Sequence, residues 1–283
     1  MLWAVLFFTG MHGCVKAMAS FHVWEIVFFR SGITALFCMS YLKAKGISLI
    51  GNHQGNLLLR SIFGIISMVL FFVTLQRMPM GAAVTLKYLS PIFAALFAYL
   101  MLKEDVRPVQ WLFFVAAFGG VLLLKGFDER IDLLNLMLGL IGAVFGGLVY
   151  VMIRKIGQSE HPMVIINYFM TLATIIAGIG MISHWRTPVS TEWLYLLGMG
   201  TFGYFGQVYM TRALQVEAAS RVAPIKYMEV VCTLLLGLVW FGEGYGLLSL
   251  LGITVIIASM LMNLTLKHNT HATRQRIAMR QRQ

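Results

Sequence analysis

The sequence is poor in charged residues, which make up only 12% of its 283 positions. Soluble domains have about 25% charged residues. This chain has 59% hydrophobic residues instead, with a mean hydropathy of +0.81. Ten membrane-spanning helices of roughly 20 residues each would fit this length and leave only short connections. No stretch remains for a soluble domain, and we therefore predict an all-α integral membrane protein.

Aspartate is scarce, and the chain lacks the short motifs of many enzymes and pumps. Asp105, Asp128 and Asp132 all fall between the predicted spans, which excludes an intramembrane aspartyl dyad. There is no His-Glu-x-x-His zinc motif and no P-loop. The three cysteines lie in apolar runs, without disulfide or metal-ligand spacing. The sequence thus predicts neither an enzyme nor an ATP-driven pump, and we expect no cofactor and no metal site.

Ten apolar segments are separated by short polar stretches. The predicted spans are residues 2–19, 23–42, 57–76, 80–102, 108–124, 133–153, 162–183, 192–212, 219–241 and 245–266. Most basic residues between them lie on the side of the C-terminal tail, so the positive-inside rule places both termini in the cytoplasm. This rule also accounts for the net charge of +11, so we do not expect the protein to bind nucleic acid. No basic segment precedes the first apolar run, so we expect no cleaved signal peptide and predict a multi-pass protein of the bacterial inner membrane.

The second half of the chain repeats motifs of the first at a constant offset of 139 residues. The matched motifs are Phe63-Gly64 with Phe202-Gly203, Leu75-Gln76 with Leu214-Gln215, Lys87-Tyr88 with Lys226-Tyr227, and Glu104 with Glu243. Each half holds five spans, and because five is odd the second half enters the membrane from the opposite side. We predict two inverted five-helix repeats, residues 1–126 and 133–266, and a basic cytoplasmic tail, residues 267–283. Secondary transporters share this plan and bind substrate near the midplane between the repeats.

The motifs of the repeats resemble those of the drug/metabolite transporter superfamily, in its EamA-type branch. The resemblance covers nearly the whole chain and rests on Lys16, Phe29-Arg30, Leu89-Ser90-Pro91-Ile92, Leu102-Lys103-Glu104, Gly119-Gly120-Val121 and Glu243. In the second half the proline is displaced to Pro224, and Val230 stands where Pro91 has its equivalent. The resemblance implies alternating access through a cavity lined by spans one to four and six to nine. It also implies a role for lysines in spans four and nine, which phosphate-sugar and nucleotide-sugar exchangers of the superfamily use.

Lys87 and Lys226 are the first candidates for substrate binding or gating. Each lies about seven residues into its span, roughly 10 Å along the helix, so both come close to the membrane midplane. An ammonium group there needs a carboxylate, water or an anionic ligand. Glu229 lies three residues after Lys226 and would neutralise it locally, whereas Lys87 has no acidic residue near it on its own helix. Tyr88 and Tyr227 follow the lysines and would either contact a ligand or pack between helices.

Further polar residues within the spans are candidates for the same site. Thr9, His12 and Lys16 share one face of span one, and Asn167, Thr171 and Thr174 share one face of span seven. Gln207 in span eight joins these candidates. We expect Arg30 either to pair with Glu25 one turn away or to bind a ligand. Arg60 is near the end of span three, where it would snorkel to the interface.

Glu104 and Glu243 lie at helix ends and are expected to cap or close the structure against loop backbone, and Pro91 and Glu25 are expected to be structural. Within the predicted spans basic side chains outnumber acidic ones. We therefore predict a secondary active transporter of a small anionic or zwitterionic metabolite, coupled to a proton or a counter-substrate. The alternatives are an exporter of amino acids or apolar drugs and, in another class, a membrane scaffold or interaction protein. The expected partners are the substrate and the lipid bilayer, for a monomer or a homodimer.

Overall fold

A computed structural model describes residues 1–102, 108–126, 129–216, 219–259 and 261–262. Glu104 and the tail of residues 267–283 lie outside these residues. The backbone of Lys226 is described, but its side chain is not. The roles predicted for Glu104, Lys226 and the tail therefore stay predictions.

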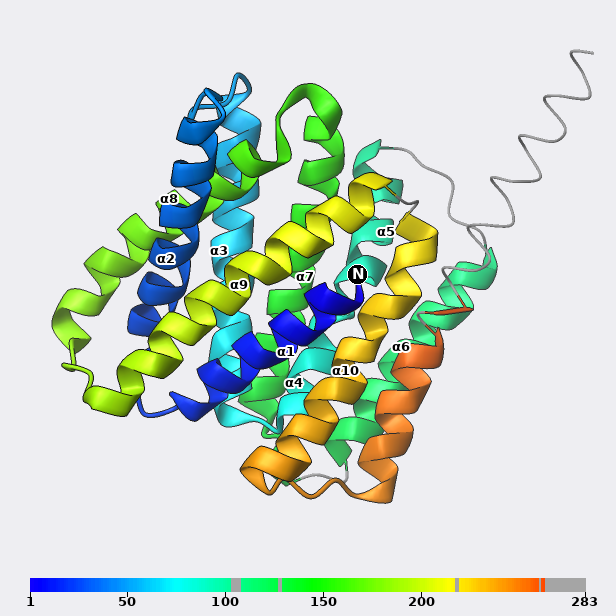
Figure 1. The fold of residues 1–283 in the computed structure, drawn as a ribbon. Coiled ribbons are helices and arrows are strands. Elements are labelled where there is room, and N and C mark those ends of the chain that lie inside the picture. The colour runs from blue at the N-terminus through cyan, green and yellow to red at the C-terminus, as the bar shows by residue number, and fades with distance from the viewer. Residues whose placement is uncertain (103–107, 127–128, 217–218, 260, 263–283) are drawn as a thin grey trace, which may run out of the picture.

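The described chain folds into helices at all ten predicted positions (Figure 1). They are α1 (Leu2–Ala17), α2 (Val23–Ala44), α3 (Gln54–Arg77), α4 (Met80–Lys87), α5 (Ser90–Leu102), α6 (Pro108–Gly126), α7 (Leu133–Ile156), α8 (Pro162–Met181), α9 (Ser190–Val216), α10 (Ala219–Phe241) and a further helix, Leu247–Ser259. Short 3₁₀ turns, Gly157–Ser159 and Ile182–His184, follow α7 and α8. No strand occurs in the described ranges.

Span four differs from the prediction, because it is broken in two. α4 ends at Lys87 and α5 begins at Ser90. Pro91 explains the break: it has no N–H for the carbonyl of Lys87, and its ring clashes with that carbonyl. The Ser90 hydroxyl donates to the Lys87 carbonyl instead, at 2.7 Å. α10 has Val230 at the equivalent position and continues without a break.

The two halves pack with exchanged partners, as a two-fold relation requires. α1 packs on α9 while α7 packs on α3, α2 meets its equivalent α8, and α4 meets α10. The halves are also inverted. Lys16 near the end of α1 contacts Glu243 just after α10, and Arg130 just before α7 donates to the carbonyl of Gly244. α1 therefore ends at the side where its counterpart α7 begins; we call this side the Glu243 end.

Glycines at the helix contacts let these backbones approach closely. A Cβ atom on Gly142 of α7 would meet the Leu70 side chain and the Ser67 carbonyl of α3. A Cβ on Gly200 of α9 would lie only 2.5 Å from a side-chain atom of Ile33 on α2. These glycines are structural.

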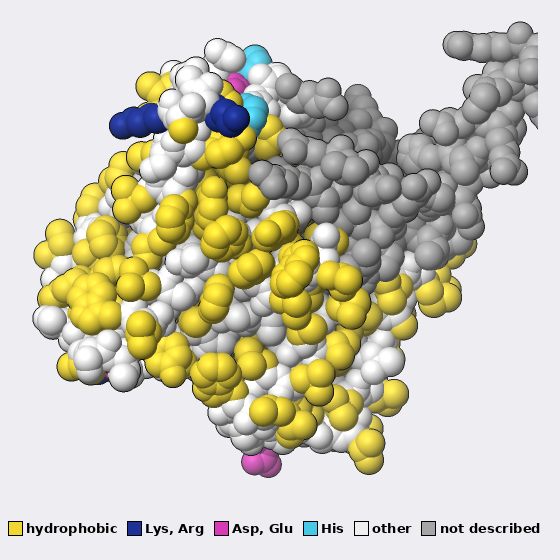
Figure 2. Space-filling view, in the orientation of Figure 1, with side chains coloured by type: hydrophobic (Ala, Val, Ile, Leu, Met, Phe, Trp, Pro, Cys, Tyr) yellow, Lys and Arg dark blue, Asp and Glu magenta, His cyan; other side chains and the backbone are white. Residues whose placement is uncertain are grey.

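The outer surface of the bundle is apolar across its middle (Figure 2). Large exposed side chains such as Leu36, Leu122, Ile179 and Val239 come from many helices. In Figure 2 the visible Lys, Arg and His side chains gather at the top together with acidic atoms, and further acidic atoms lie at the bottom. Among the described residues, five helical segments are long and apolar enough to cross a membrane when α4 and α5 are counted as one, and four shorter helices are also apolar. This band matches a bilayer core between two polar interfaces.

Candidate substrate site

The break in span four lies where the two halves cross. The rings of the equivalent residues Tyr88 and Tyr227 meet there, with centroids 5.2 Å apart. Both residues are buried. The repeat predicted from the sequence therefore brings its paired motif together in space, on the line that relates the halves.

A cluster of four polar side chains, His12, Lys87, Tyr88 and Glu229, surrounds this crossing; we call it the Lys87 cluster. One carboxylate oxygen of Glu229, Oε1, lies 3.6 Å from Lys87 Nζ and 3.4 Å from His12 Nδ1. The other, Oε2, accepts a 2.8 Å hydrogen bond from the Tyr88 hydroxyl. Lys87 Nζ and His12 Nε2 are 3.5 Å apart. The first half supplies the cation, the imidazole and the phenol, and the second half supplies the carboxylate.

Burial is unequal within this cluster. Glu229 and His12 have fully buried side chains, whereas 32% of the Lys87 side chain stays exposed. The Lys87 ammonium also lies over two aromatic rings, 4.5 Å from the centroid of Phe71 and 5.8 Å from that of Phe8. The face of an aromatic ring attracts a cation electrostatically, but it does not fix the cation in one position as a directional hydrogen bond would. Lys87 is thus the member of the cluster that an incoming ligand meets first.

The structure gives Lys87 an acidic neighbour that the sequence did not predict, Glu229. The sequence argument considered only residues on the same helix, while the partner, Glu229, comes from α10. The predicted local pair of Glu229 with Lys226 is not tested, because the Lys226 side chain is outside the described part. The aromatic neighbours of Lys87 were also missed. Phe8 lies one turn before His12 on α1, a spacing that could have identified it, but Phe71 comes from α3 and no sequence pattern links it to Lys87.

A second polar cluster closes the Glu243 end. Glu243 Oε1 lies 2.8 Å from Lys16 Nζ, and the Lys16 ammonium also donates to the Met78 carbonyl. Glu243 Oε2 accepts from the backbone N–H of Met80, the first residue of α4, at 2.8 Å, and from the Tyr245 hydroxyl at 2.5 Å. Burial and this hydrogen bond raise the pKa of Tyr245, so its phenol remains a donor. Glu243 therefore contacts backbone at the start of a helix of the opposite half and not the loop backbone expected from the sequence, and its closing role stays a prediction.

The opposite end of the bundle has a comparable contact that the sequence did not reveal. Glu160, before α8, accepts from the backbone N–H of His53, which precedes α3, at 2.7 Å. Glu160 is buried. Each end is thus held by a glutamate of the second half on a backbone N–H at the start of a first-half helix.

The predicted pair of Arg30 with Glu25 is wrong. Glu25 accepts from the backbone N–H of His22 at 3.2 Å, which caps α2, and from that of Arg186 at 2.7 Å. The Arg30 guanidinium contacts methionine sulfur instead, Met68 at 2.9 Å and Met170 at 3.2 Å. Glu25 thus binds two backbone N–H groups, and that of His22 lies at the start of α2, where the helix dipole also favours a carboxylate. Both contacts are of the structural kind expected for Glu25, whose role stays a prediction.

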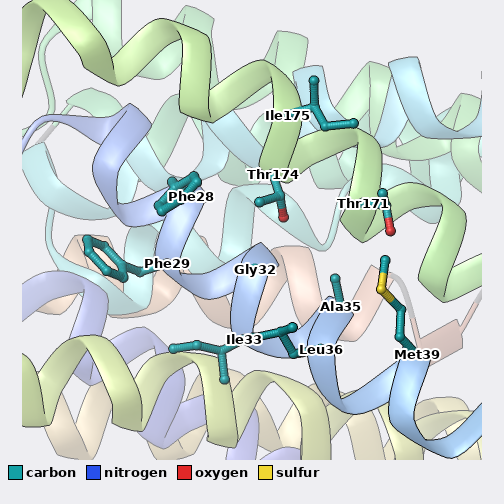
Figure 3. A pocket seen from close by; sticks show the side chains of 10 residues that line it. All are labelled: Phe28, Phe29, Gly32, Ile33, Ala35, Leu36, Met39, Thr171, Thr174 and Ile175. Carbon is teal, nitrogen blue, oxygen red and sulfur yellow. The ribbon is translucent and has the colours of Figure 1, made fainter.

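The remaining candidates form no hydrogen bond with the Lys87 cluster among the described residues. Asn167 and Thr9 are buried, with Asn167 Oδ1 and Thr9 Oγ1 lacking hydrogen-bond partners, and Gln207 is half-buried without a hydrogen bond to a described residue. Thr171 and Thr174 line a groove of about 360 Å³ between α2 and α8 (Figure 3). Other residues of its rim, Leu36 and Ile175, are largely exposed, so the groove opens on the lipid-facing surface. With no titratable side chain in its lining, this groove is not the candidate site.

Comparison with known proteins identifies the family. The profile of the EamA-like transporter family matches residues 1–125 and again residues 133–265. The chain belongs to this family. It is therefore a multi-pass membrane transporter and not an enzyme, and the scaffold alternative is set aside.

Relatives support the same assignment. The pseudopaline exporter of Pseudomonas aeruginosa is 32% identical over 264 residues, covering 92% of this chain and 93% of the exporter. Human solute carrier family 35 member G1 is 29% identical over 248 residues, covering 81% of this chain and 68% of the carrier. A solved crystal structure aligns with a TM-score of 0.65 at 18% identity, over 93% of both chains, and supports the fold. Family membership fixes the class of protein, whereas the substrate has to be argued from the site.

Proposed function

We propose that this family member is a secondary active transporter that moves a small anionic or zwitterionic metabolite across the bacterial inner membrane by alternating access. Both termini would lie in the cytoplasm. One observation carries the proposal: the partly exposed ammonium of Lys87 is shared with a buried carboxylate of the other half, beside a broken helix. Transporters place discontinuous helices at such midplane sites.

The Lys87 cluster is suited to exchange its internal ion pair for a ligand. A carboxylate on the substrate would bind Lys87, and an amino group on the substrate would bind Glu229. A zwitterion therefore replaces both partners at once and leaves no buried charge unpaired. A purely anionic substrate would leave Glu229 to take up a proton, which links its transport to proton movement. An apolar drug offers no partner for either charge, and the cluster disfavours that alternative.

The Glu243 end supplies a gate for this mechanism. Lys16 and Glu243 join the halves at one side of the membrane, and Glu243 also holds the first turn of α4. α4 carries Lys87 at its other end. Opening the Lys16–Glu243 contact would therefore free the helix that holds the substrate-binding lysine. Lys226 retains its proposed role as the equivalent lysine of the second half.

The test begins with a thermal-shift screen of purified full-length protein against amino acids, other zwitterions and organic acids. A compound that stabilises the protein is then followed by uptake into proteoliposomes. Lys87→Gln should reduce uptake by about tenfold or more, because a charged hydrogen bond contributes ~1.5–3 kcal/mol. Lys87→Arg should restore uptake only partly, since a planar fork replaces a compact charge.

Lys45→Gln is the matched control, because Lys45 is exposed in the loop after α2. Its uptake should equal that of the unmodified protein. Full uptake by the double variant Lys87→Gln, Lys226→Gln would rule out the proposed role of both lysines.

A further inference from the structure

Two buried arginines lie outside the Lys87 cluster, and neither contacts a carboxylate among the described residues. Arg30 on α2 is 4% exposed. Its Nη1 donates only to the sulfur atoms of Met68 and Met170, and its Nε has no hydrogen-bond partner. A thioether is a weak acceptor. Arg30 is therefore a cation buried inside the bundle whose only hydrogen-bond acceptors among the described residues are weak ones.

Arg60 on α3 is in the same position. It is 7% exposed, so the expectation that it snorkels to the interface is wrong. Its guanidinium lies 4.2 Å above the Phe169 ring, and its Nε and Nη1 are buried without hydrogen-bond partners. The ring of Phe169, on α8, holds the side chain inside the bundle.

Both arginines are held by consecutive residues of α8, Phe169 and Met170. The same segment of α8 carries two further buried atoms without partners, Asn167 Oδ1 and Thr171 Oγ1. Two arginine side chains and two polar side-chain atoms thus lie along the same stretch of α8, and no hydrogen bond joins them to one another. Unpaired buried charges and polar groups destabilise a fold, and ionisable residues within a membrane usually serve function.

This arginine pair adjoins the Lys87 cluster. On α3, Met68 contacts Arg30, and Phe71, one turn further, contacts Lys87. On α1, His12 belongs to the Lys87 cluster. The preceding residue, Met11, lies beside Arg30, because a Cβ on Gly203 would be 3.2 Å from the Met11 sulfur and 3.5 Å from Arg30 Nε. The α1 and α3 side chains thus separate the arginine pair from the Lys87 cluster. A single substrate molecule that extends past these side chains would contact both the arginine pair and the cluster.

We propose that Arg30 and Arg60 bind a second carboxylate of the transported substrate, with the Asn167 side chain beside them. This inference rests on the proposed function of the Lys87 cluster and narrows its substrate to compounds with two carboxylates. The guanidinium fork matches a carboxylate in two parallel hydrogen bonds. The Met and Phe side chains around it favour a singly charged group over a more strongly hydrated phosphate. In the substrate-free protein the Arg30 guanidinium donates to the methionine sulfurs, and the substrate carboxylate, a stronger acceptor, replaces them.

The test measures thermal stabilisation of the full-length protein in detergent by succinate, glutarate and adipate, and by butyrate, valerate and hexanoate as matched monocarboxylates. The variants are Arg30→Met and Arg60→Met. Arg77→Met is the control, because Arg77 is exposed at the end of the same helix as Arg60. We expect each of the first two variants to weaken the best dicarboxylate by about 10- to 100-fold and to leave monocarboxylates unchanged.

A second readout separates ligand binding from a structural role. Replacing an unpaired buried charge by an apolar side chain is neutral or stabilising. The ligand-free melting temperature of Arg30→Met and Arg60→Met should therefore equal or exceed that of the unmodified protein. A decrease of about 4 °C or more in both variants would make the arginines structural and overturn the inference.

Other outcomes also decide the matter. Dicarboxylate binding that is unchanged in both arginine variants overturns the inference, and so does an unmodified protein that no dicarboxylate stabilises. If 3-phosphonopropionate stabilises the protein and no dicarboxylate does, the carboxylate assignment is wrong. Lys87→Gln distinguishes this failure from that of the proposed function: it should weaken mono- and dicarboxylates alike, and a lack of effect on both would count against the Lys87 cluster itself.

Discussion

α4–α5 and α10 occupy equivalent positions in the two repeats, yet one is broken and the other is continuous. Pro91 breaks the first, and Val230 allows the second to continue. One residue earlier, Ser90 stands where the second half has Glu229. The broken helix ends at the lysine of the ion pair, and the continuous helix carries its carboxylate. A cation at a helix C-terminus is favoured by the helix dipole. The repeat therefore supplies a common frame, and the two substitutions turn it into a site with one charge from each half.

The largest effect is expected for Lys87→Met, which leaves the fully buried Glu229 without its cation. Breaking a buried pair in this way costs about 3–5 kcal/mol of unfolding free energy. The double variant Lys87→Met, Glu229→Leu should recover most of this loss, as measured by unfolding of the protein in detergent. If the double variant is no more stable than the single one, the two residues are not energetically coupled.

Exchanging the features of the two helices is the next test. Val230→Pro should break α10 beside Glu229 and cost about 3 kcal/mol. Pro91→Ala should let α4 and α5 join, with stability kept or increased, but should reduce transport because Lys87 changes position. Thermal unfolding and proteoliposome uptake measure the two effects. Full uptake by Pro91→Ala would mean that the break is not needed for function.

The tyrosine pair allows a smaller and closely matched comparison. Tyr88→Phe removes the hydrogen bond to Glu229 and should cost ~1.5–3 kcal/mol. Tyr227 makes no hydrogen bond to a described residue, so Tyr227→Phe should cost less than about 0.5 kcal/mol. Equal losses for the two variants, again by unfolding in detergent, would contradict the assigned asymmetry.

The smallest expected effect is at the break itself. Ser90→Ala removes the hydroxyl that binds the free Lys87 carbonyl and should cost about 1 kcal/mol. The control is Thr233→Ala in α10, whose hydroxyl bonds to the Val230 carbonyl at 2.9 Å within a continuous helix. A cost for Thr233→Ala as large as that for Ser90→Ala would show that the break adds nothing to the value of this hydrogen bond.

The sequence was sufficient for the parts of the structure that depend on local pattern. Apolar length located the spans, and the constant offset between Lys87-Tyr88 and Lys226-Tyr227 predicted two inverted repeats. Pro91 was noted as structural, but span four was predicted as one helix. A helix-breaking proline is visible in a sequence, whereas its outcome depends on whether neighbours such as Ser90 satisfy the freed carbonyl.

The site itself was only half predictable. His12, Lys87, Tyr88 and Glu229 were all candidates, because polar residues are costly in a membrane. Their pairing was not predictable, since Glu229 reaches Lys87 from a helix of the other half. The Arg30–Glu25 prediction failed for the related reason that proximity along a helix does not decide between a side chain and a free backbone N–H. Arg60 was expected to snorkel to the interface, because no sequence pattern shows that it stacks on Phe169 of α8.

α4 is only eight residues long, about 12 Å. Its first turn is fixed by one carboxylate of the opposite half, and its last residue is followed by an interruption in the helical hydrogen bonds. If the Glu243 contact opens, α4 can tilt about the break after Lys87 while α5 stays in place. The moving part that exposes a substrate could thus be far smaller than half of the molecule.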